Sequence, residues 1–397
     1  MTEISKGCGI VCEYNPFHTG HAYQMQKVKD LTGKPVICVM SGGFTQRAEP
    51  ACRNKLLRAG DAVKNGADIV LELPFPYSCM GARDFAYSAV SVLIKSGMCD
   101  SIAFGSECDD IDLLNNIAHL IADTSFNKSI SEIQKSDKTL SYARARILAA
   151  EKALGKTASD VLANPNDILA AEYLRANILY GSPLKPISVK RETPRGGKDN
   201  NFASSSYIRA AIDGAKKAGL AEIPDEIKRF LPYDANIEDF ETDFSLFETV
   251  MHLSICAQSP KRLENIAEVP HGAGYLIFEN ALKSKTYGEF LKNLSTKCFT
   301  NAKIRRMILF CFFGITKEQA KENLDYTFLL ASTMTGRTLL SETRGKRDIL
   351  LASKTANLKG SPGAMRRRQC AKYAEEVVEK CHQKQVGLTD KKTPTIL

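Results

Sequence analysis

Two histidines, His18 and His21, lie where the first predicted strand gives way to a helix. The apolar run Gly9–Cys12 predicts a short strand in a parallel sheet, Asn15-Pro16 predicts a turn, and Thr19-Gly20 opens a segment with helical periodicity. A helix N-terminus carries free N–H groups and a partial positive charge that attract phosphate, and a glycine lets phosphate approach the backbone closely. The pair therefore indicates phosphoryl or nucleotidyl transfer, in which charge stabilisation supplies most of the catalysis.

The same pair has plainer interpretations, namely surface decoration or half of a zinc site. A zinc site needs further ligands, and the chain has neither a paired C-x-x-C nor a third histidine near His18 and His21. No acidic ligand cluster stands out either, so the sequence assigns no metal-ligating residue. Two histidines that flank a glycine at a strand-to-helix turn favour the phosphate interpretation.

A second candidate anion site follows the first by almost two hundred residues. Ser204-Ser205-Ser206 caps a predicted helix that also carries Arg209. Taken alone, this is an ordinary helix cap beside a surface arginine. Together with His18 and His21 it favours a second phosphate-binding helix end.

Alternating strands and helices must position both motifs. Further strands are predicted at 36–40, 68–74, 101–105 and 186–191, with helices at 53–65, 84–96, 113–122 and 166–178 between them. Such alternation predicts an α/β fold, a Rossmann-like parallel sheet with right-handed crossovers. Ligands of such sheets bind at the carboxyl ends of the strands. The loops after strands one, two and four would therefore converge on one crevice.

The chain of 397 residues, with 44% apolar and 25% charged residues, has a globular composition and a length typical of two domains. We expect an α/β domain at 1–222, an acidic linker at 223–243 and a mostly helical, basic domain at 244–397. The net charge of +9 suggests a polyanionic partner. Lys297, Arg305 and Arg306, near Phe299, are the candidate contacts to a nucleic-acid backbone, and the alternative is a solvated helix face.

The cysteines and the apolar runs indicate the cellular compartment of the protein. The 12 cysteines are scattered, which is typical of reduced, mostly buried thiols in a cytosolic protein. We find no signal-peptide core and no apolar run that would span a bilayer. A cytoplasmic protein without membrane contact is the expectation.

The two motifs resemble signatures of a known superfamily. His18-Thr19-Gly20-His21 and Ser204–Arg209 resemble the HxGH and ISSTxxR signatures of HUP-type nucleotidyltransferases, which are related to class I aminoacyl-tRNA synthetases. More narrowly, four segments resemble the family of bacterial tRNA(Met) cytidine acetate ligases: Glu13–His21, Val39–Arg47, Glu72-Leu73-Pro74 and Phe104–Glu107. The resemblance extends over nearly the whole chain and is best in the first 110 residues.

The resemblance implies a ligase that forms a C–N bond. Members activate acetate with ATP to acetyl-adenylate, release pyrophosphate, and acetylate N4 of the wobble cytidine of elongator tRNA(Met), with AMP as the by-product. It implies ATP, with Mg²⁺, as co-substrate, and acetate and tRNA as partners. The family's ATP contacts carry over onto Val11, Cys12, Glu13, Tyr14, Asn15, Pro16, Phe17, His18, Thr19, Gly20, His21, Ala22, Tyr23, Gln24, Gly105, Asn166 and Arg191.

Roles follow as hypotheses. His18 and His21 would stabilise charge on the α- and β-phosphates, whereas Ser205, Ser206 and Arg209 would hold the β- and γ-phosphates. Lys297, Arg305 and Arg306 would contact tRNA. Two alternatives stay open: an adenylyltransferase acting on a small phosphorylated metabolite, and a non-catalytic nucleotide- and RNA-binding protein.

The chain departs from the family pattern at three places. Glu192–Asn200 replaces an aromatic-His-Asp sequence after Arg191, Asp167 replaces a second asparagine after Asn166, and Ala48 stands where glycine is usual. These departures bear on loop closure more than on nucleotide binding.

Overall fold

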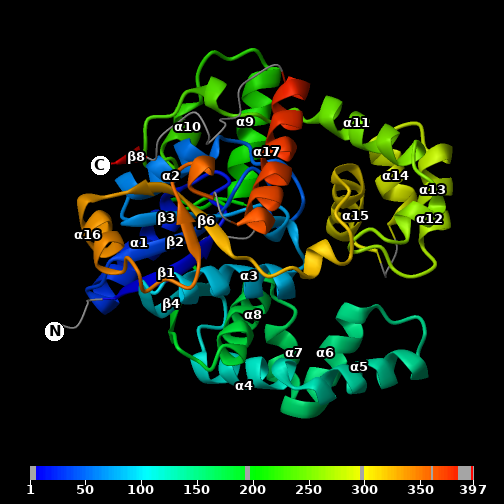
Figure 1. The fold of residues 1–397 in the computed structure, drawn as a ribbon, viewed down its shortest axis with the longest axis horizontal. Coiled ribbons are helices and arrows are strands. Elements are labelled where there is room, and N and C mark those ends of the chain that lie inside the picture. Colours follow the sequence, from blue (N-terminus) through cyan, green and yellow to red (C-terminus); the bar gives the residue numbers. More distant parts are fainter. Residues whose placement is uncertain (1–5, 193–196, 296–298, 359–360, 383–394, 397) are drawn as a thin grey trace.

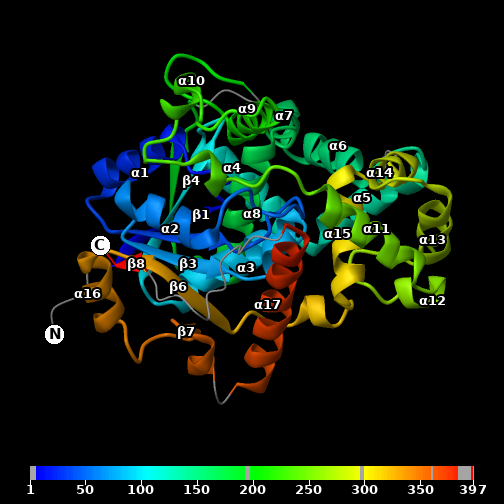
Figure 2. The ribbon, with the colours of Figure 1, turned by 90° about the horizontal axis from the view of Figure 1, so that it is seen from above.

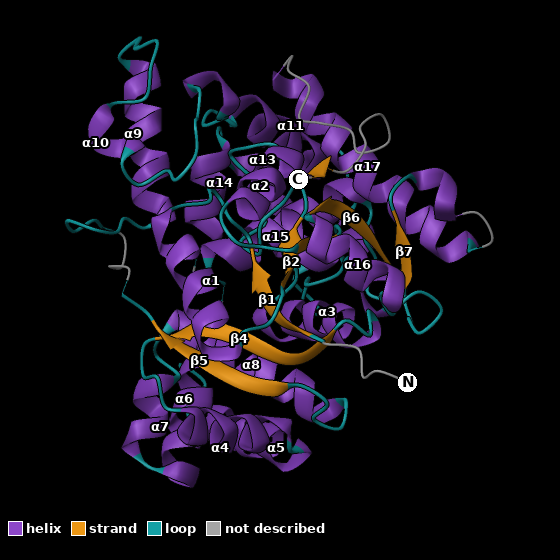
Figure 3. Ribbon diagram, turned by 90° about the vertical axis from the view of Figure 1, so that its left-hand side faces the viewer, coloured by secondary structure: helices purple, strands orange, loops and turns teal. Residues whose placement is uncertain are grey.

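A mostly parallel sheet forms the centre of the protein. The computed structural model describes residues 6–192, 197–295, 299–358, 361–382 and 395–396. Within them the strand order is β5-β4-β1-β2-β3-β6-β7, and β8 pairs with β6. Figure 3 shows β5 and β7 at opposite edges of the sheet. The strands are β1 (Gly7–Cys12), β2 (Val36–Ser41), β3 (Ile69–Leu73), β4 (Cys99–Ser106), β5 (Lys185–Lys190), β6 (Tyr326–Ser332), β7 (Leu350–Ala352) and β8 (Thr395–Ile396).

The first five strands are parallel, as the alternating pattern predicts. Alternate residues of β2 serve the two faces of the sheet. Ile37 and Val39 join a core with helices α3 (Ala82–Lys95) and α8 (Pro165–Leu179). Val36, Cys38 and Met40 join a second core with α1 (Thr19–Thr32) and α2 (Lys55–Lys64). Burial on both faces explains why these strands are continuous apolar runs in the sequence.

Close packing of β1 on α3 fixes this layer. A Cβ atom added at Gly9 would lie 2.6 Å from a methyl carbon of Leu93 in α3. A side chain at position 9 would therefore displace the Leu93 side chain, whereas glycine lets Leu93 pack directly against β1.

A helical excursion separates β4 from β5. It contains α4 (Ile111–Ala122), α5 (Thr124–Ser136), α6 (Tyr142–Leu154) and α7 (Lys156–Val161) before α8 returns to the sheet. Figure 1 shows α5 and α6 extending away from the sheet along its lower side. No described helix is long and apolar enough to cross a membrane.

The segment 223–243, expected as a linker, is packed rather than extended. It contains α10 (Asp225–Lys228), and its Phe230 and Phe240 are buried in one cluster with Ile208 and Ile212 of α9 (Ser205–Lys217). Its backbone also contacts the loop between β2 and α2, where the Glu241 N–H donates to the Cys52 oxygen over 2.6 Å. Residues 223–243 therefore pack against α9, and the predicted domain boundaries stay a prediction.

The part of the chain after 244 is mostly helical but not wholly so. Its helices are α11 (Ser245–Cys256), α12 (Pro260–Leu263), α13 (Gly274–Lys283), α14 (Tyr287–Leu294), α15 (Asn301–Phe313), α16 (Met334–Glu342) and α17 (Pro362–His382). Strands interrupt the helices at 326–332 and 350–352, because β6 pairs antiparallel with β3 and β7 extends that edge. Figures 1 and 2 show α17 between the sheet and the group α11–α15. The sheet thus crosses the predicted division at 223–243.

Candidate active site

A cleft of about 440 Å³ opens where β1, β2, β4 and β5 end. This placement confirms the prediction that the loops after strands one, two and four converge. The lining residues come from these loops and from α1, α3, α8 and α9. They are Val11, Cys12, Glu13, Tyr14, Asn15, His21, Gln24, Gln46, Arg47, Ala82, Phe85, Phe104, Gly105, Pro165, Asn166, Ile168, Leu169, Tyr173, Arg191, Ser205 and Arg209.

The two histidines are locked to each other by a capping box at the start of α1. The Gly20 N–H donates to Nδ1 of His18 over 3.0 Å, and the His18 N–H donates to Nδ1 of His21 over 3.3 Å. The two rings stack with centroids 3.7 Å apart. Because both Nδ1 atoms accept hydrogen bonds, each neutral ring carries its proton on Nε2. The pair therefore offers two Nε2–H donors.

Both imidazoles are neutral at neutral pH. Burial, with a further contribution from Arg191, lowers the pKa of His18 to about 3. Burial lowers the pKa of His21 well below its usual range, and the charges of His18 and Arg191 act in the same direction. Cationic charge at the site therefore comes from arginines, whereas the histidines act as directional hydrogen-bond donors.

The backbone at the start of α1 differs from the expectation of free N–H groups. The Thr19 N–H donates to the Phe230 oxygen over 2.9 Å, and the Gly20 N–H is used by His18. These two N–H groups are therefore engaged within the protein. The side chains of the turn and the helix dipole are what this helix end offers to an anion.

The second motif meets the first across this turn. Ser204 caps α9 through the Tyr207 N–H, and the hydroxyl of Ser205 donates to the Pro16 oxygen over 3.5 Å. Nη1 of Arg209 donates to the Asn15 oxygen. Both Ser205 and Arg209 line the cleft, as the two motifs together predict.

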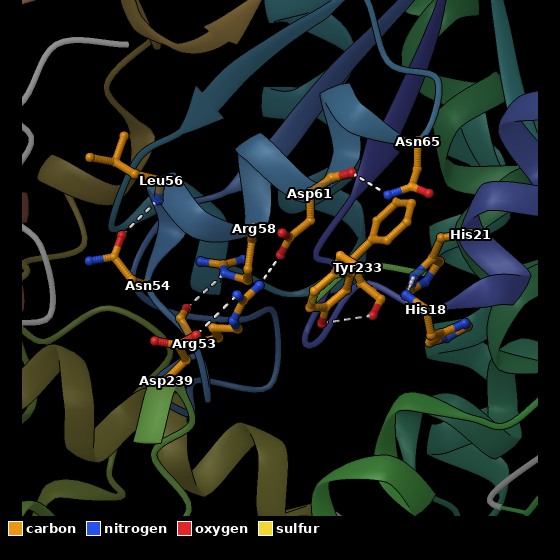
Figure 4. A network of polar contacts seen from close by, with 11 residues as sticks. His18, His21, Arg53, Asn54, Leu56, Arg58, Asp61, Asn65, Tyr233 and Asp239 are labelled. Atoms are coloured by element: carbon orange, nitrogen blue, oxygen red, sulfur yellow. Dashed lines mark hydrogen bonds and ion pairs between the residues drawn. The ribbon is translucent and has the colours of Figure 1, made fainter. Parts of the chain in front are cut away.

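A polar network on α2 supports the turn from behind. Arg53 pairs with Asp61 and lies over the ring of Tyr233, with its guanidinium carbon 4.6 Å from the ring centroid. The Tyr233 hydroxyl in turn donates to the Phe17 oxygen over 3.2 Å. Figure 4 shows Tyr233 between the Arg53–Asp61 pair and the two histidines. Packing from α2 thus reaches the residue before His18.

Arg58 of α2 ties the ends of two strands together. Its guanidinium is fully buried, and Nη1 donates to the Glu13 oxygen over 2.5 Å and to the Ser41 oxygen over 3.2 Å. Nη2 donates to the Gly42 oxygen. Burial lowers the pKa of Arg58 from its usual value. One side chain therefore fixes the loops after β1 and β2 relative to each other.

The loop after β4 is held by Asp167, one of the three departures from the family pattern. Its Oδ1 accepts from the Ser106 hydroxyl over 2.6 Å and from the Glu107 N–H over 2.8 Å. Asn166 beside it donates to Oε1 of Glu107 over 2.7 Å. A carboxylate is suited to this acceptor role, so the substitution keeps Gly105 and Asn166 at the cleft.

Another departure is explained by backbone geometry. Ala48 has a φ of 59°, in the left-handed region that glycine adopts without steric cost. This conformation suits the glycine that the family resemblance implies for this position. The third departure falls partly on residues 193–196, which lie outside the described residues.

The predicted ATP contacts divide into two groups in the structure. Twelve of the predicted nucleotide-binding residues line the cleft: Val11, Cys12, Glu13, Tyr14, Asn15, His21, Gln24, Gly105, Asn166, Arg191, Ser205 and Arg209. The other predicted residues do not line the cleft. They lie in the turn after β1, in the first turns of α1 and at the start of α9: Pro16, Phe17, His18, Thr19, Gly20, Ala22, Tyr23 and Ser206. Ser206 is exposed, and its hydroxyl lies 3.1 Å from that of Ser204.

Motif reasoning missed several lining residues. Gln46 and Arg47 end the loop after β2, a loop that was expected at the crevice without these two being assigned to the site. The apolar wall, formed by Phe85, Phe104 and Tyr173, carries no sequence signal beyond ordinary core residues. Only the fold shows that these side chains reach the cleft.

The predicted tRNA contacts do not form a free basic patch. Arg306 is buried, and its Nε lies 3.5 Å from Oε1 of Glu268, so the prediction of a surface contact there is wrong. Arg305 is 25% exposed, with Nη1 2.8 Å from Oε1 of Glu49. Its contact with tRNA stays a prediction. Lys297 lies outside the described residues.

No group of three or more His, Cys, Asp or Glu side chains within the described ranges is arranged to hold a metal ion. Near the phosphate-binding motifs the cleft offers the carboxylates of Glu13 and, behind Asn166, Glu107. Such a donor set fits Mg²⁺ only as a companion of a triphosphate, which itself supplies oxygen ligands.

The fold and this site define a nucleotidyltransferase of the HIGH type. A family model described as HIGH Nucleotidyl Transferase matches residues 5–390. The solved structure of Thermotoga maritima TmcAL bound with alpha-thio ATP is 26% identical and superposes with a TM-score of 0.86, with 99% of each chain covered. The apo form of the same protein gives a TM-score of 0.88 over the same shares of both chains.

Curated relatives narrow the class. The tRNA(Met) cytidine acetate ligase of Clostridium botulinum strain Okra is 33% identical, covering 85% of this chain and 84% of its own. That of Thermoanaerobacter sp. strain X514 is 34% identical, with 88% and 89% covered, and that of Thermosipho africanus is 34% identical, with 87% and 84% covered. The chain belongs to the tRNA(Met) cytidine acetate ligase family.

Proposed function

We propose that the protein is an ATP-dependent tRNA(Met) cytidine acetate ligase. It activates acetate as acetyl-adenylate with release of pyrophosphate, and transfers the acetyl group to N4 of a cytidine in tRNA, the wobble cytidine of elongator tRNA(Met). The observation that carries the proposal is the meeting of two motifs at one cleft. His21, stacked on His18, lines one cleft together with Ser205 and Arg209, and this space can hold a triphosphate.

In the first step an acetate oxygen attacks the α-phosphorus and pyrophosphate leaves. His21 donates from Nε2 to the α- and β-phosphate oxygens as their charge grows. His18 orients His21 through the 3.3 Å bond and the ring stack, since His21 and not His18 lines the cleft. Mg²⁺, held mainly by the phosphates, would share the charge.

Two arginines lie beside the proposed phosphate path. Arg209 and Ser205 of α9 hold the β- and γ-phosphates, and Arg191 after β5 adds positive charge that is felt at both histidines. Apolar side chains of β4 and α8, among them Phe104 and Leu169, line the same side and suit the adenine ring.

In the second step the cytidine amine attacks the carbonyl carbon of the adenylate, and AMP leaves. No covalent enzyme intermediate is needed, because the adenylate is already activated. The helical part of the chain after residue 244 is the proposed tRNA-holding part. Within it, α17 lies between the sheet and the group α11–α15.

The test is incubation with ATP, isotope-labelled acetate and tRNA(Met), followed by mass spectrometry of tRNA nucleosides and assay of AMP. We expect labelled N4-acetylcytidine and one AMP for each acetyl group. A small-metabolite adenylyltransferase would retain the nucleotide in its product and make no AMP. A non-catalytic binding protein would release no pyrophosphate. Either of those results would overturn the proposal.

A further inference from the structure

The cleft has two halves, separated by the end of β1. On one half lie Gly105, Asn166 and Arg191, from β4, α8 and the loop after β5. On the other half lie Gln46 and Arg47 after β2, and Phe85 of α3 after β3. The carried-over nucleotide contacts fall on the first half and on the turn after β1. The second half is open to another substrate.

Glu13 stands at the boundary between the halves, with one carboxylate oxygen fixed. Its Oε1 accepts from the Gln46 N–H over 2.6 Å, and its backbone oxygen is held by Arg58. Among the described residues, Oε2 has no hydrogen-bond partner, and it is not a buried oxygen shielded from solvent. Because Glu13 lines the cleft, this oxygen is available to a substrate.

Two neighbours also have unused hydrogen-bonding capacity. Nε2 of Gln46 donates to the Met80 oxygen over 3.1 Å, which fixes the amide and leaves its Oε1 as an acceptor without a described partner. Arg47 is exposed and makes no hydrogen bond or ion pair with any residue that the structure describes. The half-cleft thus presents two acceptors and one cationic donor group.

This arrangement complements one edge of an aminopyrimidine. Cytosine presents an amine that donates two hydrogen bonds, beside a ring nitrogen and a carbonyl oxygen that accept. Glu13 Oε2 and Gln46 Oε1 match the amine, and the Arg47 guanidinium matches the two acceptors. Uracil would place a carbonyl oxygen against the two acceptors and be rejected, because three acceptor oxygens would then face one another without a donor.

We propose that this half of the cleft is the acceptor subsite for the cytosine base, and that Oε2 of Glu13 takes the proton that the amine loses during acetyl transfer. The inference rests on the proposed function and names its second-step machinery. The C–N bond forms as the bond from the acetyl carbon to the phosphate oxygen breaks. AMP leaves with that electron pair, and the carboxylate of Glu13 becomes a carboxylic acid.

The surroundings of Glu13 suit a proton acceptor. Burial raises the pKa of its carboxyl, while nearby arginines oppose the shift. The charged and titratable groups that face it come from every packed element: Arg47 on the loop after β2, Arg58 on α2, Arg209 on α9, Tyr173 on α8 and Cys79 after β3. A raised pKa makes the carboxylate a stronger base.

The experiment separates the two chemical steps. Acetate-dependent ATP–pyrophosphate exchange measures the first, and single-turnover transfer from synthetic acetyl-adenylate to tRNA, over a range of pH, measures the second. The variants are Glu13→Gln, which keeps an acceptor for the Gln46 N–H, and Glu13→Asp. The matched control is Glu49→Gln, on the same loop as Gln46 but paired with Arg305 outside the cleft.

For Glu13→Gln we expect transfer slower by roughly 10²- to 10⁴-fold, the usual contribution of a general base. Because Glu13 is also a predicted nucleotide contact, exchange falls too, but at least about tenfold less than transfer does. Glu13→Asp, which keeps a carboxylate, restores part of the transfer rate. Arg47→Ala raises the KM for tRNA more than it lowers kcat.

Normal transfer by Glu13→Gln, or an equal loss of exchange and transfer, would overturn the acceptor subsite while leaving the ligase assignment standing. Absence of acetate-dependent exchange in the wild-type protein would instead overturn the proposed function itself.

Discussion

Basic side chains are used differently in the cleft and at the junction where α15 and α17 pack on the sheet. In the cleft, Arg47 has no described partner, and Arg209 is held by a backbone oxygen, so neither charge is neutralised by a carboxylate contact. At the junction, cations face carboxylates: Lys55 contacts Glu72 and Glu375, and Arg306 lies beside Glu268. Arg367 likewise contacts Glu322 and Asp325.

The difference shows that basic residues in a sequence are not equivalent as binding groups. A cation paired with a carboxylate holds two structural elements together, and its charge is compensated. A cation held by neutral groups keeps an uncompensated positive charge that can attract an anion. The run Arg366-Arg367-Arg368 reads as a basic patch, yet Arg368 is fully buried and lies over the ring of Phe328. The variants below test this division, from the largest expected effect to the smallest.

Lys55→Met tests the junction at its most buried point. Nζ of Lys55 lies 2.7 Å from Oε1 of Glu72 and also contacts Glu375 of α17, and all three side chains are buried. Removing the cation leaves two buried carboxylates together, so we expect a loss of about 3–5 kcal/mol in the free energy of unfolding. Urea denaturation measures it. The control Lys156→Met, an exposed pair with Asp160, should change it by less than about 1 kcal/mol.

His21→Ala tests the cleft. Loss of one preformed donor to a developing oxyanion should slow acetate-dependent pyrophosphate exchange by roughly 10²- to 10³-fold. His119→Ala, at an exposed position on α4, serves as the control and should match wild type. Wild-type exchange in His21→Ala, with the variant folded, would remove His21 from the first step.

The dependence of stability on pH distinguishes the buried neutral histidines from the paired cations. The pKa of His18 is about 3 when folded and 6.5 as the ordinary value, so between these pH values the unfolded chain binds more protons. Stability therefore rises with pH across this window, by about 1.4 kcal/mol per unit from His18. At pH 5 its contribution is lower than at pH 7 by about 2 kcal/mol. Urea denaturation of wild type and His18→Gln at both pH values measures this contribution. If stability changed equally with pH in the two proteins, the low pKa of His18 would be contradicted.

Arg305→Met tests whether an arginine in an exposed ion pair still binds tRNA. Because its partner Glu49 is 35% exposed, we expect a change below about 1 kcal/mol in stability. If the predicted tRNA contact holds, the slope of log affinity against log salt falls by about one in this variant. Filter binding over a range of salt concentrations is the measurement, and an unchanged slope would contradict the contact.

The sequence predicted the elements that carry local signals. The apolar runs of β1 to β4, and the histidine and serine caps of α1 and α9, were each visible within a few residues, and the two motifs meet as expected. The partners of Arg306 and Arg368 were not visible, since burial depends on contacts between distant segments. The same holds for β6, whose apolar residues 326–332 lie in a region of helical pattern. The role of Gln46 also required its orientation toward Met80, which no spacing reveals.

The pairing of β6 with β3 joins positions more than two hundred and fifty residues apart, since Val70 faces Ala331. During synthesis β3 is complete long before β6 leaves the ribosome. Until then β3 is an open strand edge with unsatisfied backbone groups, a surface that recruits other strands and promotes aggregation. Fragments that end near residue 222 would keep both signature motifs but retain this edge, so soluble expression should require the chain through β6.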